Sequence, residues 1–217
     1  VSRGDSTLRG HNFLEPFIIN QLLGPFDATF YIPAFIEAKR ITINGNHLVN
    51  DVFAHETVFS KDKIFGYETS NLKDLIYLKS KSKINLDHIK NLYTHDLNSL
   101  QVSKDNKVYK FIKNLKYNKF IIVDITNYSQ LDNFTNVVRS IGGEKKFLFR
   151  TAASFISSIS KVNQKKVTLL NLLKLRRKDK YNKVMHGLIV VGSYVELTNL
   201  QLNELLNYSH FNKCLKN

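Results

Sequence analysis

The residues best suited to chemistry form one short stretch near the start of the chain, with a carboxylate, two hydroxyls and a guanidinium between two glycines. In chain order the stretch contains Gly4, Asp5, Ser6, Thr7, Arg9 and Gly10. Glycine lets the backbone turn tightly and approach a ligand closely, and backbone N–H groups ahead of a helix attract an anion. The planar fork of Arg9 suits a carboxylate or a phosphate. The stretch therefore predicts an anion-binding loop; the alternative is a plain helix cap in which Arg9 pairs with a surface acid.

Further polar residues, with one glycine among them, follow the ends of the buried strands that the sequence predicts. In chain order they are Arg40, Asp124, Arg150, Thr151, Ser154, Gly192 and Ser193. Because open α/β sheets bind ligands at the carboxyl edge of their strands, we expect these residues to line one cleft. Taken singly, each has a simpler explanation: a surface ion pair for Arg40, a turn for Asp124 and Gly192, and a helix cap for Ser154.

Several well-known motifs are absent from the sequence. It contains no Walker-type glycine-rich lysine motif, no Gly-x-Gly-x-x-Gly after a strand and no Gly-x-Ser-x-Gly elbow. His55 and Glu56 are adjacent, but neighbours on a strand point apart, and no second histidine stands at ligand spacing. Cys214 is the only cysteine, which argues against a disulfide framework and a thiolate metal cluster. We expect neither a nucleotide site nor a metal site in this chain.

Hydrophobic periodicity predicts the elements that position these residues. We expect strands over residues 28–32, 120–123, 146–149 and 187–191, and helices over 12–23, 70–82, 86–100, 107–115, 129–141, 152–159 and 198–206. An Asn44-Gly45 turn between two β-branched runs predicts a hairpin over 41–49. Three strand–helix alternations imply a parallel sheet with right-handed crossovers. The predicted fold class is α/β: one three-layer, Rossmann-like domain over 1–217, with a mainly parallel sheet and a β-hairpin excursion.

The composition narrows the compartment and the partners. With 43% hydrophobic residues the chain can bury a core, and no apolar run approaches the ~20 residues of a membrane span. The charged start lacks a signal peptide, so we expect a cytoplasmic protein with no membrane partner. The net charge of +14 raises nucleic acid as a partner. The lysines are spread among Asn and Ile, as codon bias in an AT-rich genome produces, so we do not expect nucleic acid as the main partner.

Several of these segments together resemble the N-terminal, substrate-binding domain of the four-carbon acid sugar kinase family. The matching words are residues 2–11 (Ser-Arg-Gly-Asp-Ser-Thr-Leu-Arg-Gly-His), Pro33-Ala34-Phe35 with Glu37 and Arg40, His55-Glu56-Thr57 with Phe59 and Asp62, residues 149–155, and residues 190–194 with Thr198, Gln201 and Leu202. The Asp-Ser-Thr-Leu-Arg-Gly motif is the most specific of these segments. The other segments follow in the same order as in the family, which supports the resemblance. The match spans nearly the whole chain and is thinnest over residues 79–118.

Members of that family phosphorylate sugar acids such as threonate, erythronate or their oxo derivatives with ATP. The resemblance implies that the acid is held by Asp5, Ser6, Arg9 and Gly10, with Arg150, Ser154 and Ser193 in the same cleft. From the pattern of the residues we add Thr7, Arg40 and Gly192. The resemblance also implies that ATP and Mg²⁺ bind outside this chain, on a nucleotide-binding domain that would follow Asn217. A family strand with an Asp-Asp-Leu-Thr-Gly loop would precede Val1 and could supply the carboxylate that activates the attacking hydroxyl.

We therefore expect the acceptor-binding part of an ATP-dependent kinase for four-carbon sugar acids, inactive when alone. No catalytic residue is assigned within the chain. The expected partners are a small sugar acid and the nucleotide-binding domain of the same protein, and the oligomeric state stays open between a monomer and a homo-oligomer. The alternative is a basic, non-catalytic interaction module that binds nucleic acid or an acidic partner.

Overall fold

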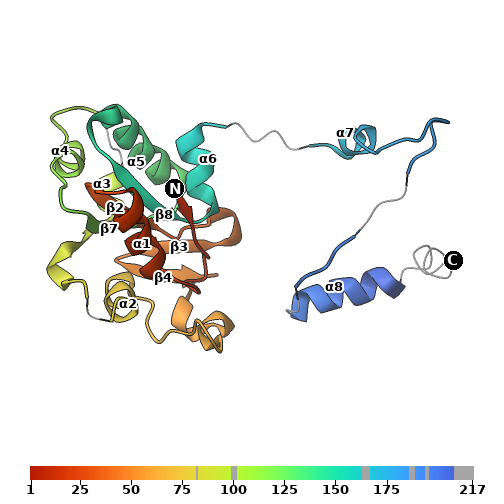
Figure 1. The fold of residues 1–217 in the computed structure, drawn as a ribbon, viewed down its shortest axis with the longest axis horizontal. Helices are drawn as coiled ribbons and strands as arrows, with labels where there is room; N and C mark the ends of the chain where they lie inside the picture. Colours follow the sequence, from red (N-terminus) through yellow and green to blue (C-terminus); the bar gives the residue numbers. More distant parts are fainter. Residues whose placement is uncertain (82, 99–101, 163–166, 186–188, 194–195, 208–217) are drawn as a thin grey trace. The chain divides into compact units, whose positions relative to one another are not determined.

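A parallel sheet of five strands organises the first part of the chain (Figure 1). In spatial order the strands are β1 (Ser2–Arg3), β8 (Phe147–Thr151), β2 (Ala28–Ile32), β7 (Lys119–Val123) and β6 (Ile89–Leu92). Every pair is parallel, and all residues of the central strand β2 are buried, as a strand covered on both faces requires. The carboxyl ends of the strands therefore share one edge, where the loops after β1 and β2 begin.

This computed structural model describes residues 1–81, 83–98, 102–162, 167–185, 189–193 and 196–207. The chain separates into two compact units, Val1–Gln164 and Lys165–Asn217. The sheet belongs wholly to the first unit, which also carries the Asp5–Gly10 loop.

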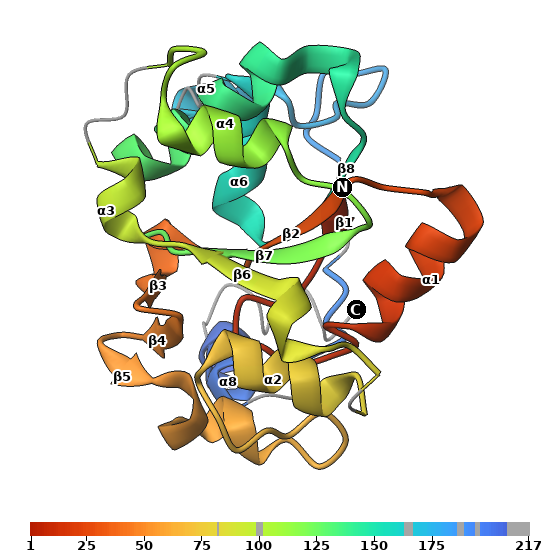
Figure 2. The same ribbon diagram turned by 90° about the vertical axis from the view of Figure 1, so that its left-hand side faces the viewer.

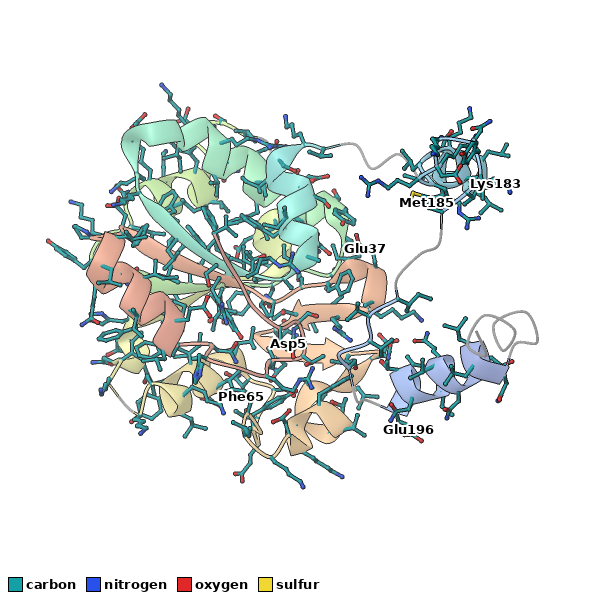
Figure 3. The ribbon with its side chains drawn as sticks, turned by 45° about the vertical axis from the view of Figure 1, so that its right-hand side comes forward. Asp5, Glu37, Phe65, Lys183, Met185 and Glu196 are labelled. Carbon is teal, nitrogen blue, oxygen red and sulfur yellow. The ribbon has the colours of Figure 1, made fainter. Side chains whose placement is uncertain are left out.

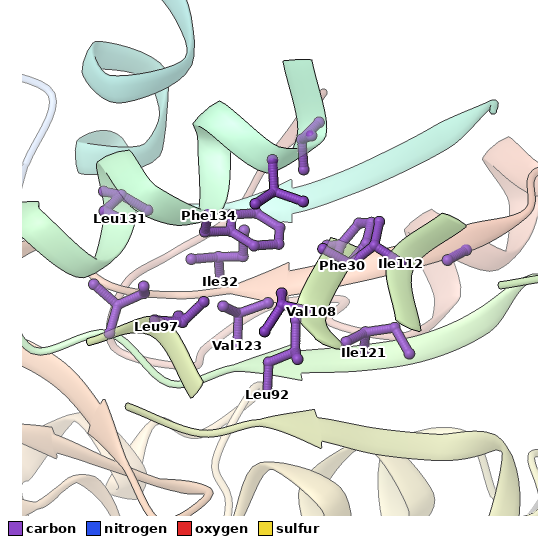
Figure 4. Close-up of a cluster of buried hydrophobic side chains, with 14 of the residues drawn as sticks. Phe30, Ile32, Leu92, Leu97, Val108, Ile112, Ile121, Val123, Leu131 and Phe134 are labelled. Carbon is purple, nitrogen blue, oxygen red and sulfur yellow. The ribbon is translucent and has the colours of Figure 1, made fainter. Parts of the chain in front are cut away.

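Helices cover both faces of the sheet (Figure 2). The α-helices of the first unit are α1 (Leu14–Leu23), α2 (Leu72–Lys79), α3 (Thr94–Leu97), α4 (Lys107–Lys113), α5 (Tyr128–Ile141) and α6 (Ala153–Ser160). Short 3₁₀ turns are η1 (Ile36–Ala38), η2 (Ala54–Glu56), η3 (Val58–Lys61), η4 (Leu86–His88) and η5 (Gly142–Glu144). On one face, α4, α5 and α6 enclose a core that includes Phe30, Ile121 and Phe134 (Figure 4). On the other face, α2 contributes Leu72 and Ile76 to a second core. The result is the three-layer α/β fold that the sequence predicts.

A small antiparallel sheet lies beyond the carboxyl edge of the main sheet. It consists of β3 (Arg40–Ile43), β4 (Asn46–Val49) and β5 (Val52–Phe53). The turn residues Asn44 and Gly45 both have positive φ, which is the geometry of a tight primed hairpin turn. The N–H of Gly45 donates to both carboxylate oxygens of Asp124, at 3.2 and 3.0 Å, directly after β7. Asp124 thus fixes the tip of the hairpin to the main sheet.

One predicted helix is wrong. Residues 86–100 contain the edge strand β6 and the short helix α3. Ile89 and Leu92 are both buried, one in each core. Two buried residues three positions apart are typical of a helix, but in a strand the same spacing places them on opposite faces. The ambiguity of a four-residue strand explains the error.

Two further features differ from the prediction. The strand β1 was not predicted, because two residues carry no periodic signal. In α1, Phe13 and Phe17 pack into the core, whereas Ile18 and Leu22 of the expected apolar face are 42% and 77% exposed. The helix is therefore anchored by its aromatic start rather than along its length.

The second unit is described by itself. It contains α7 (Leu169–Lys174), α8 (Glu196–Asn207) and an isolated bridge between Lys178 and Val184. Of the strand predicted over 187–191, residues 187–188 lie outside the described residues, and residues 189–191 form no strand. A strand needs a hydrogen-bonding neighbour, and the described part of this unit gives this segment none. Within the described residues of the whole chain, no helix is long and apolar enough to cross a membrane.

Candidate functional site

The Asp5–Gly10 loop starts at the carboxyl edge of the main sheet. β1 lies in register with β8, with Ser2 opposite Arg150, and the N–H of Gly4 donates to the carbonyl of Thr151 at 2.8 Å. The chain then leaves the sheet and turns, so that the Leu8 N–H meets the Asp5 carbonyl at 3.2 Å. Leu8 has φ of 64° and is fully buried, a costly conformation for a branched side chain. Its burial holds the loop in one shape.

Asp5 organises the loop through its carboxylate (Figure 3). One oxygen accepts the Thr7 N–H at 2.9 Å, and the other accepts the Thr7 hydroxyl at 2.6 Å and the Arg9 Nε at 2.7 Å. Burial raises the pKa of Asp5, but the hydrogen bonds from Thr7 and Arg9 outweigh it and hold the pKa below its usual value. Asp5 is therefore ionised at neutral pH, and its oxygens are occupied in orienting Thr7 and Arg9.

Arg9 and Arg40 lie on the same aromatic ring. Their guanidinium carbons are 5.4 and 5.5 Å from the centroid of the Phe59 ring, within the range of a cation–π contact. Arg40 also donates from Nη1 to the Ser6 hydroxyl at 2.6 Å, and Arg9 Nη1 lies 3.7 Å from Asp62. The Nε of Arg40 is buried and has no hydrogen-bond partner within the described residues. Two guanidinium groups on one ring, one of them with a buried unsatisfied nitrogen, are groups of the kind that bind anions, although Asp5 and Asp62 offset part of the charge of Arg9.

His47, in the hairpin strand β4, supports the Asp5–Gly10 loop. Its ring is fully buried, with Nε2 at 2.9 Å from the Ser6 carbonyl and Nδ1 at 3.0 Å from the Thr42 hydroxyl. A carbonyl can only accept, so Nε2 carries the proton and Nδ1 accepts from Thr42. Burial lowers the pKa of His47 to about 4, so the ring is neutral at physiological pH. In the sequence, His47 carries no signal beyond its inward position in the hairpin strand.

The pKa of Asp124 is raised and that of His47 is lowered, so both groups should make the stability of the protein depend on pH. Replacing Asp124 alone separates the two contributions. Burial raises the pKa of Asp124 to about 6, so its ionisation removes about 3 kcal/mol of stability as the pH rises from its unfolded pKa to its folded pKa. The low pKa of His47 acts the other way, because stability present above its unfolded pKa is lost as the pH falls toward 4. In the wild type the two trends offset each other between about pH 4 and 6.5.

We expect Asp124→Asn to remove only the first trend. Its free energy of unfolding relative to wild type should rise by about 3 kcal/mol between pH 4 and pH 7, because the neutral amide still accepts the Gly45 N–H. Urea unfolding at several pH values measures this difference. The new amide N–H can change the stability of the variant by an amount that is the same at every pH. If the difference between variant and wild type shows only this constant part, the pKa of Asp124 is not raised.

Arg150 is buried rather than presented to solvent. It is 3% exposed, and its Nη1 donates to the Ser2 hydroxyl at 2.7 Å and the Arg3 carbonyl at 2.9 Å and pairs with Glu15 at 2.8 Å. Its Nε has no partner within the described residues. A Cβ on Gly4 would come within 2.9 Å of that nitrogen, so a glycine is needed there. In this structure Arg150 ties β1 and α1 to β8; its contact with a ligand stays a prediction.

Ser154 belongs to a different cluster. Its hydroxyl donates to Glu37 at 2.7 Å and accepts the Ile36 N–H at 2.9 Å, and the Tyr128 hydroxyl also donates to Glu37. Burial raises the pKa of Glu37, but the hydrogen bonds from Tyr128 and Ser154 have the larger effect. The pKa of Glu37 is therefore below its usual value. Glu37 and Asp132 both line an adjoining cavity of about 640 Å³. Arg139 and Lys161 line the same cavity, so its two acidic and two basic side chains balance in formal charge.

The structure thus brings together only part of the predicted set. Asp5, Ser6, Thr7, Arg9 and Arg40 form one cluster with Phe59, and Gly10, at φ of 94°, ends the loop. Gly192 and Ser193 lie in the second unit, where Thr198 donates to the Ser193 hydroxyl at 3.1 Å. Their assignment to the same site stays a prediction. Among the described residues, no three His, Cys, Asp or Glu side chains gather as metal ligands.

Solved structures share this fold at low sequence identity. Haemophilus influenzae protein HI1011, of family DUF1537, is 19% identical with a TM-score of 0.54 over 73% of this chain and 36% of its own. A DUF1537 protein from Bordetella bronchiseptica, solved as a domain-swapped dimer with bound citrate, is 16% identical with a TM-score of 0.56, over 72% of this chain and 34% of its own. This chain therefore spans about a third of the length of these neighbours.

The family of the chain follows from its sequence. No sequence among functionally characterised, curated proteins matches it. A family model described as a sugar-binding N-terminal domain matches residues 1–159, the part that holds the sheet and the Arg9–Arg40 cluster. The chain belongs to the family of sugar-binding N-terminal domains found in DUF1537-type, four-carbon acid sugar kinase proteins.

Proposed function

We propose that this chain binds the acid acceptor in an ATP-dependent kinase that phosphorylates four-carbon sugar acids of the threonate, erythronate or oxo-tetronate type. The observation that carries the proposal is the pair of guanidinium groups, Arg9 and Arg40, that both contact the Phe59 ring. Together they offer a fixed double cation for one carboxylate. The family description and the citrate bound to the Bordetella neighbour, itself a hydroxy acid, support an acidic ligand of this kind.

Each residue of the cluster has a proposed part in binding. Arg40 holds the carboxylate through its guanidinium group, and a ligand that reaches its buried Nε would give that donor a partner. Arg9, oriented by Asp5, closes on the same carboxylate. The hydroxyl of Ser6, already bonded to Arg40, and that of Thr7 meet the ligand's hydroxyl groups at the loop. Binding of this kind fixes the position of the acceptor hydroxyl and so lowers the entropic part of the barrier.

The phosphate donor belongs to another part of the protein in this proposal. ATP with Mg²⁺ supplies the phosphoryl group, and a nucleotide-binding domain of the same protein holds it. The described residues of this chain bind and orient the acceptor, and none of them is assigned as the catalytic base. Phosphoryl transfer depends mainly on such positioning and on charge stabilisation, so loss of an acceptor contact should affect both binding and turnover.

Titration calorimetry with sugar acids tests the proposal. Threonate or erythronate should bind, whereas the neutral polyols threitol and erythritol, which keep the hydroxyls without the carboxylate, should bind at least 30-fold more weakly, as loss of a charge-assisted contact of about 2 kcal/mol implies. Arg9→Met should weaken acid binding by a similar factor. Arg3→Met, which removes an exposed arginine from β1, is the matched control and should leave binding unchanged.

Two outcomes would count against the proposal. If polyols bind as well as acids, the site does not recognise a carboxylate. If no four-carbon acid binds to the folded chain, and none binds to the full-length protein, the substrate class is wrong.

A further inference from the structure

Five lysines surround one cavity at the opposite edge of the sheet from the proposed acceptor site. The cavity measures about 580 Å³ and is lined by Lys90, Lys107, Lys110, Lys116 and Lys119, together with Phe111 and Tyr117 and without an acidic side chain. It lies at the amino-terminal end of β7, whereas the Asp5–Gly10 loop follows the carboxyl ends of the strands. The two sites are therefore separate.

The fold explains why these lysines meet. In the parallel register Lys90 of β6 stands beside Ile121 of β7, so both side chains point to the same face of the sheet. Lys119 is two residues before Ile121 and shares that face, since strand side chains alternate. Ile121 belongs to the core beneath α4. On α4, Lys107 and Lys110 are three residues apart and form one side of the helix, next to these strand lysines.

Tyr117 gives this basic cavity an aromatic surface. It is 86% exposed and has φ of 62°, and Asn118 next to it has φ of 48°. Two consecutive non-glycine residues in the left-handed region are unusual, and a bulky aromatic residue there is strained. The side chain of Asn118 accepts the Thr29 hydroxyl at 2.7 Å, which secures the turn to β2. The turn therefore holds a tyrosine ring in solvent beside the lysines, although glycine would fit the backbone better.

Nearby carboxylates offset only part of the charge. Asp105 lies 3.4 Å from Lys110, with an almost fully exposed side chain. Asp27 pairs with Lys145 at 3.0 Å and is influenced by Lys116. Lys90, Lys107 and Lys119 have no ion pair within the described residues. In the sequence the lysines are spread among Asn and Ile, whereas in the folded unit five of them gather around one cavity beside Tyr117.

We propose that this cavity, the Tyr117 cavity, binds single-stranded nucleic acid without sequence preference. Lysines act as point charges that contact phosphates wherever these lie along a strand. An exposed tyrosine can stack on any base, because every base has a flat face. Together the lysines and the ring match the two contacts that such binding uses.

Fluorescence anisotropy with a labelled twelve-residue oligothymidylate or oligouridylate tests the proposal. The triple variant Lys90→Gln, Lys107→Gln, Lys116→Gln removes three exposed cations and should weaken binding at least tenfold at 50 mM salt. The slope of log affinity against log salt should become shallower by about 2, since each lost phosphate contact contributes about 0.7. The matched control Lys174→Gln, Lys178→Gln, Lys183→Gln removes the same charge from exposed positions of the second unit. It should weaken binding by less than twofold and leave the salt slope unchanged.

Tyr117→Gly separates binding from folding. Glycine relieves the positive φ, so the melting temperature should equal or exceed that of the wild type, while loss of stacking should weaken binding about tenfold with an unchanged salt slope. Tyr181→Gly removes another exposed tyrosine, 71% exposed in the second unit, and should leave binding intact.

Three results would overturn the proposal. Equal losses from the two lysine triples would show that only net charge attracts the strand. Full binding by Tyr117→Gly would mean that the ring makes no contact with bases. Displacement of the oligonucleotide by inorganic tripolyphosphate at equal phosphate concentration would assign the cavity to a small polyphosphate.

Discussion

Arg150→Met is expected to lower the free energy of unfolding of the first unit by about 3 kcal/mol, the largest loss of stability from any single substitution considered. Methionine fills much of the same volume, so the loss is mainly electrostatic and polar. It removes the Arg150 donor from the Ser2 hydroxyl and the Arg3 carbonyl and leaves Glu15 with the Ser2 hydroxyl but without its ion-pair partner. For a unit of this size the melting temperature should fall by about 10 °C.

Urea and thermal unfolding of the variant measure this effect, and Glu15→Gln provides the comparison. The Glu15 side chain is 44% exposed, so water can solvate it when its pair is removed, and its replacement should cost about 1 kcal/mol or less. A double-mutant cycle between the two positions then gives the part that depends on the pair. If Arg150→Met were as stable as Glu15→Gln, Arg150 would not be the tie between β1 and β8.

Arg40→Met is expected to weaken the binding of threonate or erythronate by a factor of about 100, with less than about 1.5 kcal/mol of lost stability. The effect on binding should exceed that of Arg9→Met. Arg40 is the cation with a buried unsatisfied nitrogen, and it also holds the Ser6 hydroxyl at 2.6 Å. Within the described residues, its side chain makes that hydrogen bond and contacts two phenylalanine rings.

Two further variants make this result specific. Arg40→Lys keeps the charge and loses the planar fork, so its affinity should lie between those of the wild type and Arg40→Met. Lys39→Asn removes the exposed neighbouring cation at a positive φ that asparagine tolerates and should bind like the wild type. If Arg40→Met and Lys39→Asn lost the same affinity for the acid, the acid would be attracted by the general positive charge of this region and not bound by Arg40 itself.

The sequence predicted the elements whose signals are local. The Asn44-Gly45 dipeptide fixed the hairpin because both turn positions require positive φ. The central strand β2 was equally clear, since five consecutive apolar or β-forming residues can only be buried between two layers. The strand β6 was not clear, because its register is set by pairing with β7, and single-sequence periodicity does not contain that information.

The candidate site was predictable by segment but not by contact. The Asp5–Gly10 loop was found because its residue types suit an anion, and Arg40 because it follows a strand end. Ser154 follows a strand end too, yet it faces Glu37 and Tyr128. The carboxyl-edge rule identifies an edge of the sheet, and it does not say to which side of that edge a side chain points.

Phe59 and His47 illustrate what sequence reasoning misses. In the sequence, Phe59 stands out only as a residue that matches the family. The residues around it do not show that its ring will contact two arginines from distant segments. His47 was treated as a strand residue, and its neutral state depends on burial beneath the Ser6 carbonyl. Both roles arise from tertiary packing between the loop, the hairpin and η3.

The central claim, that Arg9 and Arg40 hold the carboxylate of a small sugar acid, is tested most directly by NMR. The Nε–Hε resonances of the two arginines, assigned with Arg9→Met and Arg40→Met, are followed while threonate or erythronate is added, with threitol as the neutral control. Both resonances should shift together and saturate at one dissociation constant with the acid, and neither should move with the polyol. Saturable binding of the acid with both resonances unmoved, or equal shifts with threitol, would contradict the claim.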